Sequence, residues 1–470
     1  MPRSVIRVVS AVLAVLAVLL LAACASAPAA PASAPAAPQA AAPTAASAAA
    51  PAQSGAAKTT FPTEPVTLNV WSGQPEMQAF YEQACAAYQK LHPNVTCNIL
   101  AMPVRELEQK LAATLPADTA ADVIDASPYA MVKYLDAGLI PEAPANVVEF
   151  MTKPGRFAPA LVEDNKRPDG KYYGLNFFQG RHGLYWNTDM FKEAGLTAAP
   201  KTMDELVEAA RKLAKTEGGK LARAGVSLRK TGGGSGVTEK FWMYLYPNGG
   251  SIIEKTPSGK WHSNYNNEAG RKTLQMYVDL LHKYKADSFE LKSDTEGFEL
   301  QQHAMYVRET APIQDIAKKA PNLKYDTAPL PKGVRWGDLA TGVNLWVTRT
   351  AKNPQVGWDF ALFLNSDEML RLLLDTAGWL PQRQDADLKA SLAKSPQYQA
   401  FLFNDPNYTI YTYPTLAEYD EIQTKLAERL TKAFLDGSLV DNPAGIDKFL
   451  QEAAQETDDI LKRNNHYGTN

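Results

Sequence analysis

Cysteine and histidine are scarce in this 470-residue chain, and each shortage excludes a class of protein. Three cysteines are too few for a disulfide-dense scaffold or a cysteine-rich zinc module, and the six histidines are scattered without HExxH spacing. No GxxxxGK[ST] motif occurs, so the chain carries no P-loop for ATP. The net charge of −3, from 48 Lys and Arg against 51 Asp and Glu, is too balanced for a protein held on nucleic acid by phosphate contacts. The sequence predicts no nucleic-acid partner, no metal and no cofactor.

The N-terminal segment has no charged residue between Val8 and Ala57. Its apolar run, residues 8–21, is shorter than the roughly 20 residues that span a bilayer but has the length of a signal-peptide core. The run ends in Leu21-Ala22-Ala23-Cys24, which resembles the lipobox of a bacterial lipoprotein. We therefore expect a signal peptide over residues 1–23, a lipidated Cys24 and, over 24–60, an Ala/Pro-rich tether. The alternative is an ordinary secretory signal that is cut elsewhere.

Short β-rich runs alternate with helical patterns between residues 66 and 138. Strands are predicted at 66–71, 95–100 and 123–124, and helices at 80–91, 104–115 and 128–138. This order predicts a parallel α/β sheet. Ligands of open sheets bind beyond the carboxyl ends of the strands, so Trp71-Ser72-Gly73-Gln74 and Asp125-Ala126-Ser127 lie where a site is expected.

Several motifs further along the chain resemble those of one protein family. The main block is DGKYYGL at 169–175, WNTDMFKEAGL at 186–196 and PKTMDEL at 200–206. Weaker matches follow in family order: NGG at 248–250, PLP at 329–331 and TAGWLP at 376–381. The ordered set resembles extracellular solute-binding proteins family 1, the sugar-binding lipoproteins of ABC transporters, similar in fold to maltose-binding protein.

The resemblance implies an α/β, two-lobed periplasmic-binding-protein fold of type II, with a ligand cleft between lobes joined by hinge strands. Lobe I would hold residues 61–178 plus 327–375, and lobe II residues 179–326 plus 376–470, with hinges near 173–178, near 328–331 and after Trp379. The implied function is capture of a mono- or oligosaccharide and delivery to the transmembrane permease of an ABC importer. The chain would be a monomer, lipid-anchored in the bacterial cell envelope outside the cytoplasm, and not an enzyme.

Departures from the family pattern keep the solute open. Arg308-Glu309-Thr310 stands where the family often has a small-polar-Trp triplet that stacks on sugar, and Asn176 replaces an expected proline. The same clamp binding a polyol phosphate, peptide or polyamine is the alternative, and an excess of Lys and Arg in the cleft would favour a phosphate. Arg181, Arg308 and Arg335 keep that reading open. A secreted glycosidase is the third hypothesis, but no carboxylate pair is isolated in the sequence.

A sugar site needs aromatic faces and planar polar groups. The candidates are polar and aromatic residues at strand ends, near the predicted hinges or at positions that line the cleft in the family: Trp71, Ser72, Gln74, Asp125, Ser127, Gln179, Arg181, Trp242, Glu309, Trp336, Asn344, Trp379, Tyr411 and Tyr413. For Trp71 and Trp242 the competing interpretation is core packing, and for Asp125 it is a helix cap.

Two further cysteines, Cys85 and Cys97, lie on a predicted helix and the strand that follows it. Neighbouring elements of one layer can bring Cα atoms within the roughly 4.4–6.8 Å that a disulfide requires, and an oxidising compartment permits the bond. We predict a disulfide; two buried free thiols are the alternative.

Overall fold

The computed structural model describes residues 61–163, 165–231, 236–403 and 405–469. The predicted signal peptide, Cys24 and the tether lie outside the described residues.

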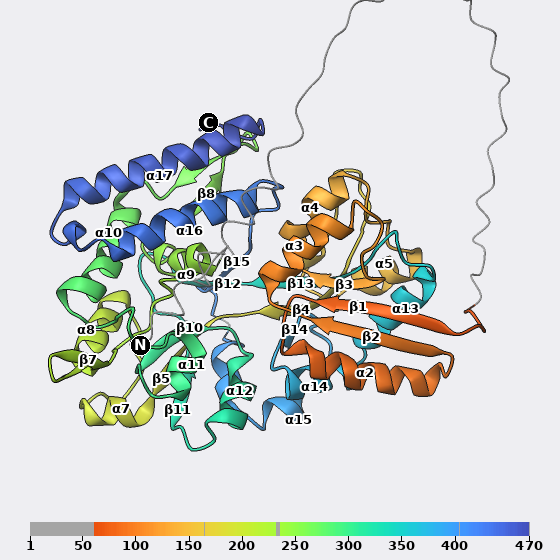
Figure 1. Cartoon of the computed structure of the whole chain (residues 1–470), viewed down its shortest axis with the longest axis horizontal. Helices are drawn as coiled ribbons and strands as arrows, with labels where there is room; N and C mark the ends of the chain where they lie inside the picture. The colour runs from red at the N-terminus through yellow and green to blue at the C-terminus, as the bar shows by residue number, and fades with distance from the viewer. Residues whose placement is uncertain (1–60, 164, 232–235, 404, 470) are drawn as a thin grey trace, which may run out of the picture. The chain divides into compact units, whose positions relative to one another are not determined.

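One six-stranded sheet has the strand order β14-β4-β13-β3-β1-β2 (Figure 1). Its strands are β1 (Val66–Ser72), β2 (Val95–Ala101), β3 (Val123–Ala126), β4 (Leu175–Gly180), β13 (Thr341–Val347) and β14 (Leu380–Pro381). The predicted parallel pairing of the first three strands is confirmed, because β1 pairs in parallel with both β2 and β3. The sheet as a whole is mixed, since β13 runs antiparallel to both β3 and β4.

Helices cover both faces of this sheet, because successive strand residues point to opposite sides. Val70 packs with the cluster under one face, while its neighbour Trp71 packs with the other. The first face is covered by α2 (Met77–Leu91), α5 (Ala145–Thr152), α13 (Pro354–Leu364) and α14 (Asp367–Thr376). The second is covered by α3 (Val104–Thr114) and α4 (Pro128–Asp136). We call the six-stranded sheet with these helices the first half.

The second half is built on an antiparallel sheet of order β10-β5-β11. Its strands are β5 (Gly183–Asn187), β10 (Met305–Arg308) and β11 (Tyr325–Ala328). A large apolar core joins α7 (Thr188–Glu193), α8 (Met203–Leu213), α9 (Gly236–Leu245), α10 (Glu268–Val278), α16 (Tyr419–Leu435) and α17 (Pro443–Arg463). Thr202 caps the N-terminus of α8: its hydroxyl accepts the Glu205 backbone N–H at 3.2 Å.

Smaller elements complete the second half and its edges. The two-stranded sheets pair β6 (Lys215–Glu217) with β7 (Lys220–Arg223), β8 (Ser251–Lys255) with β9 (Trp261–Asn264), and β12 (Gly337–Leu339) with β15 (Thr409–Tyr411). The remaining helices are α6 (Pro159–Glu163), α11 (Asp294–Glu299), α12 (Pro312–Lys319), α15 (Lys389–Leu392), a π-turn (Asp279–Lys283) and 3₁₀ turns at Pro396–Ala400 and Gly437–Leu439.

The chain crosses between the halves where β4 leads into β5, where β12 leads into β13, and again between β14 and β15. β11 pairs with β5 and β12 pairs with β15, so both strands pair within the second half, whereas lobe I was expected to resume at residue 327. Buried amides join the crossing strands: Asn176 donates to Gln382 at 2.6 Å, and Asn344 donates to Asn165 at 2.5 Å. This network explains why an asparagine can replace the proline that the family pattern led us to expect at position 176.

Cys85 in α2 and Cys97 in β2 form a disulfide, with Cα atoms 6.2 Å apart. Across the described part of the chain, no helix combines the length and the apolar character needed to traverse a bilayer.

Candidate functional site

A cavity of about 490 Å³ lies between the two halves. The first half contributes loops beyond the carboxyl ends of β1 and β3, together with α3, β13 and the segment before β14: Gly73, Gln74, Pro75, Glu76, Pro103, Val104, Arg105, Glu108, Ser127, Tyr129, Thr341, Val343 and Trp379. The second half contributes Arg229, Gly236, Glu239, Arg308, Glu309 and Tyr413. The loops that follow β1 and β3 therefore line the cavity beyond the carboxyl ends of the strands, where open α/β sheets bind ligands.

Two predicted residues support the first wall from beneath. Asp125 is buried and accepts the Gly73 N–H at 3.1 Å and the Tyr81 hydroxyl at 2.7 Å. Burial raises the pKa of Asp125 to about 6, against the lowering effect of hydrogen bonds from Ser72, Tyr81 and Gly73. Ser72 is also buried, and its hydroxyl accepts the Gln74 N–H at 3.2 Å. Both residues hold the loop that carries Gln74 and do not line the cavity themselves.

Glu76 and Trp379 form a pair in the cavity lining. The Trp379 indole N–H donates to Glu76 Oε1 at 3.1 Å, and its ring packs 5.3 Å from that of Phe178. Burial raises the pKa of Glu76, although its own backbone N–H, Arg308 and Trp379 each lower it. The wall thus offers an aromatic face beside a carboxylate.

The second wall is a buried ionic network centred on Glu309. Glu309 Oε1 lies 2.9 Å from Lys240 Nζ and 2.6 Å from His182 Nε2, and Arg308 Nη1 reaches Glu309 Oε2 at 2.9 Å. Arg308 also contacts Asp294 at 3.1 Å. These cations hold the pKa of Glu309 well below its usual value despite its burial.

His182 ties this network to the crossing segments. Its Nδ1 lies 2.8 Å from the Leu339 carbonyl, and its backbone N–H donates to Asp338, which also pairs with Arg181 at 2.7 Å. Burial and the Lys240 ammonium lower the pKa of His182, but Glu309, Asp338 and Glu239 together raise it to about 10. The imidazolium therefore donates from both ring nitrogens.

His182, Glu239 and Glu309 place one potential metal ligand each within 4.8 Å of one another. Lys240 Nζ lies 2.9 Å from both Glu239 Oε1 and Glu309 Oε1, where a cation would sit. The ammonium and the protonated imidazole already supply the positive charge, so these residues do not fit a metal ion.

Aromatic and ionic contacts join the two halves beside the cavity. The Tyr129 ring from α4 lies 4.8 Å from that of Tyr413 and 6.4 Å from that of Tyr419. Arg105 of α3 pairs with Glu108 at 2.8 Å and reaches Asp420 of α16 at 3.7 Å. The Tyr413 hydroxyl donates to Glu239.

Among the sequence-predicted residues, Gln74, Ser127, Glu309, Trp379 and Tyr413 line the cavity. The other four predicted aromatic residues pack outside the cavity lining. Trp71 lies on α3 beneath the Lys110 ammonium, and Trp242 and Tyr411 pack together with ring centroids 5.1 Å apart. Trp336 packs on Phe403 instead. These four rings lie outside the lining of the cavity, where each contacts other side chains of the protein.

Three predicted polar residues also lie outside the cavity lining. Gln179 donates to the Pro381 carbonyl at 3.2 Å, and Arg181 is committed to Asp338. Asn344 belongs to the buried amide network of the crossing strands. Each is placed near the crossings as predicted, but its polar atoms are used within the protein.

Two more lining residues, Gly73 of the strand-end loop and Arg308 of the phosphate alternative, were named from the sequence, and the others were not. Glu76 and Tyr129 each lie two positions beyond a predicted residue, Gln74 and Ser127, so extending the strand-end loops would have found them. Arg229 and Glu239 come from segments with no motif, and only the folded chain brings them to the cavity.

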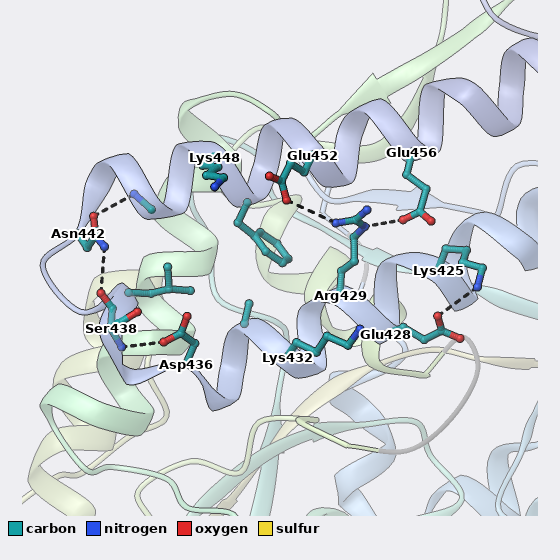
Figure 2. A pocket seen from close by; sticks show the side chains of 14 residues that line it. Lys425, Glu428, Arg429, Lys432, Asp436, Ser438, Asn442, Lys448, Glu452 and Glu456 are labelled. Carbon is teal, nitrogen blue, oxygen red and sulfur yellow. Dashed lines mark hydrogen bonds and ion pairs between the residues drawn. The ribbon is translucent and has the colours of Figure 1, made fainter.

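A second hollow of about 520 Å³ lies between α16 and α17 (Figure 2). Figure 2 shows Arg429 between Glu452 and Glu456, and Lys425 beside Glu428. Its lining holds four basic and four acidic side chains, and its charges are largely paired with one another. We therefore place the site in the cavity between the halves.

Comparison with known proteins shows which family the chain is similar to. Residues 83–400 match the family described as bacterial extracellular solute-binding protein. A binding protein of Brucella abortus (strain 2308) is 24% identical over 391 residues, 82% of this chain and 90% of its own length. The arabinooligosaccharide-binding protein of Bacillus subtilis (strain 168) is 22% identical, covering 75% of this chain and 82% of its own. A solute-binding protein of an ABC transporter from Thermotoga lettingae, bound with α-D-tagatose, matches with a TM-score of 0.72 and 21% identity over 84% of this chain and 99% of its own.

The chain belongs to the bacterial extracellular solute-binding proteins. Its two halves are the lobes of the two-lobed binding-protein fold that these structures share. Family and fold place it among extracytoplasmic binding proteins and not among enzymes.

Proposed function

We propose that the chain is the substrate-binding subunit of an ABC importer and that it captures a mono- or oligosaccharide in the cavity between the halves. The observation that carries the proposal is the lining itself: Trp379, Tyr129 and Tyr413 offer aromatic faces, while Gln74 and Glu76 offer donors and acceptors for hydroxyls. The volume of about 490 Å³ lies within the roughly 300–1,000 Å³ typical of small-molecule sites. A similar structure bound with α-D-tagatose and a relative named for arabinooligosaccharide binding support a sugar.

The charge of the lining weighs against the phosphate alternative. Three arginines, Arg105, Arg229 and Arg308, face four glutamates. Of the other arginines that kept a phosphate open, Arg181 is paired with Asp338, and Arg335 lies over the ring of Tyr246 outside the cavity. The excess of cations that a phosphate would require is therefore missing from this lining.

A thermal-shift screen tests the proposal. Purified protein is melted with sugars (tagatose, maltose, lactose, mannobiose, arabinobiose), glycerol 3-phosphate, spermidine and a tripeptide mixture. A ligand that binds only the folded state raises the melting temperature, so at least one sugar should do so. Recovery of that sugar chemically intact supports capture, whereas product release would support a glycosidase. A shift with glycerol 3-phosphate alone would contradict the sugar assignment.

The proposal extends to the anchor and the lobe boundaries. Lipidation of Cys24 would hold the chain on the membrane near its permease, and supporting evidence is the lipobox-like sequence. Labelling cells with radioactive palmitate should mark the wild type and not Cys24→Ala, which would appear in the soluble fraction. We place the second crossing near residue 340, since β12 pairs in the second half and β13 in the first.

A further inference from the structure

Glu76 differs from the other carboxylates that line the cavity. Glu108 pairs with Arg105, Glu239 with Lys240, and Glu309 with Lys240 and Arg308. Within the described residues, no ion pair is formed by Glu76, whose side chain accepts hydrogen bonds from two neutral donors, the Trp379 indole N–H and its own backbone N–H. One lining carboxylate is thus left without a close countercharge.

We propose that Glu76 sets the charge preference of the cavity: it accepts hydrogen bonds from hydroxyl or ammonium groups of the solute and rejects a solute carboxylate or phosphate. This inference rests on the proposed sugar function and specifies which sugars fit. A partly buried carboxylate without a cation leaves lone pairs that a donor on the solute satisfies. A second anion beside it would meet like charge where solvent screens poorly.

The opposite wall does not cancel this preference. Arg308 is the cation that acts on Glu76 across the cavity, but its guanidinium is shared between Asp294 and Glu309. Arg229 is likewise bound to Asp294 at 2.8 Å. An anionic solute would therefore have to displace existing ion pairs on one wall while facing Glu76 on the other.

The test compares three sugars of one skeleton: glucose, glucosamine and glucuronate, repeated for the galactose and mannose series. Dissociation constants are measured by isothermal titration at pH 7.5 for the wild type, Glu76→Gln and Glu76→Asp. Glu106→Gln, an exposed position on α3 outside the lining, controls for net charge. Gln74→Glu adds a carboxylate to the same wall and provides a second route if Glu76→Gln folds poorly.

We expect the wild type to bind the neutral and amino sugars of at least one series and the uronate at least about tenfold more weakly. Glu76→Gln should reduce the ratio of the uronate dissociation constant to the neutral-sugar dissociation constant to within about threefold, and Gln74→Glu should increase it. Glu76→Asp and Glu106→Gln should leave this ratio unchanged. Equal binding of uronate and neutral sugar by the wild type would overturn the inference, as would an unchanged ratio in Glu76→Gln. Failure of every sugar, whatever its charge, would instead overturn the proposed sugar function and this inference with it.

Discussion

The two walls of the cavity hold their acidic groups in different ways. On the first wall, Asp125 and Glu76 are held by neutral donors: a backbone N–H, a tyrosine hydroxyl and an indole. On the second, Glu239 and Glu309 are neutralised by Lys240, together with His182. The two pKa values therefore shift in opposite directions: burial raises the pKa of Asp125 to about 6, while the cations hold the pKa of Glu309 well below its usual value despite its burial.

This contrast separates two tasks. The second wall is an ionic network that connects α9 and β10 to the crossing segments through His182. Its charged groups therefore interact mainly with one another and stabilise the fold. The first wall keeps acceptors that a solute can use. We expect changes to the second wall to act mainly on stability, and changes to the first on binding and pH response.

The largest effect is expected from Lys240→Met. Removing the buried ammonium leaves Glu239 and Glu309 facing each other, and breaking a buried ion pair costs about 3–5 kcal/mol. Chemical denaturation should show this loss, whereas Lys448→Met on exposed α17 should change the free energy of unfolding by less than about 0.5 kcal/mol. Equal stability of the two variants would show that the second wall is not a structural framework.

The second-largest effect is expected on the pH dependence of stability, through the titration of Asp125. Its folded pKa of about 6 exceeds the usual 3.8, so between these values the folded chain binds more protons than the unfolded chain. The free energy of unfolding should fall by about 3 kcal/mol as pH rises from 4 to 7 through this group. Asp125→Asn lacks that loss, so its stability relative to the wild type should improve over the same range in urea titrations. Parallel pH profiles for the two proteins would contradict this.

Two tryptophan substitutions, one in the cavity lining and one outside it, test which aromatic ring contacts the sugar. Trp379→Ala should weaken sugar binding about tenfold or more, because a stacking face worth about 1–2 kcal/mol is lost from the cavity. Trp336→Ala, which removes an indole packed on Phe403 outside the lining, should leave the dissociation constant within about twofold. Similar losses in both would show that stability, and not contact with sugar, controls the measurement.

The smallest effect is expected where the halves touch. Arg105 and Asp420 are partly exposed and 3.7 Å apart, so Asp420→Asn should weaken binding by no more than about 1 kcal/mol. Isothermal titration at low and high salt should show the difference shrinking with ionic strength. A larger, salt-insensitive loss would indicate that α16 participates directly in the site.

Much of the first half could be predicted from local patterns. The run at Val66 and the helical face ending at Leu91 match β1 and α2, because hydrophobic periodicity and breakers act locally. The position of the candidate site was predicted from the same order, since parallel strands bring their carboxyl ends together. Gln74 and Ser127 were found in this way.

The second wall could not be predicted in the same manner. His182, Lys240 and Glu309 lie 58 and 69 residues apart along the chain and meet only after three separate elements pack. The packing of Trp71 and Trp242 outside the lining has a related cause: both are equally suited to covering a core, and composition does not reveal which neighbours bury them. The pairing of β12 with β15 is likewise a long-range contact that no local signal marks.

A crystal structure of the protein with the tightest-binding sugar from the screen tests the central claim most directly. We predict a sugar ring against the Trp379 indole, with a hydroxyl or amine within hydrogen-bond distance of Glu76 and the ions of the second wall still paired to one another. Sugar bound instead in the groove between α16 and α17, or in the cavity without contact to Trp379 or Glu76, would contradict it.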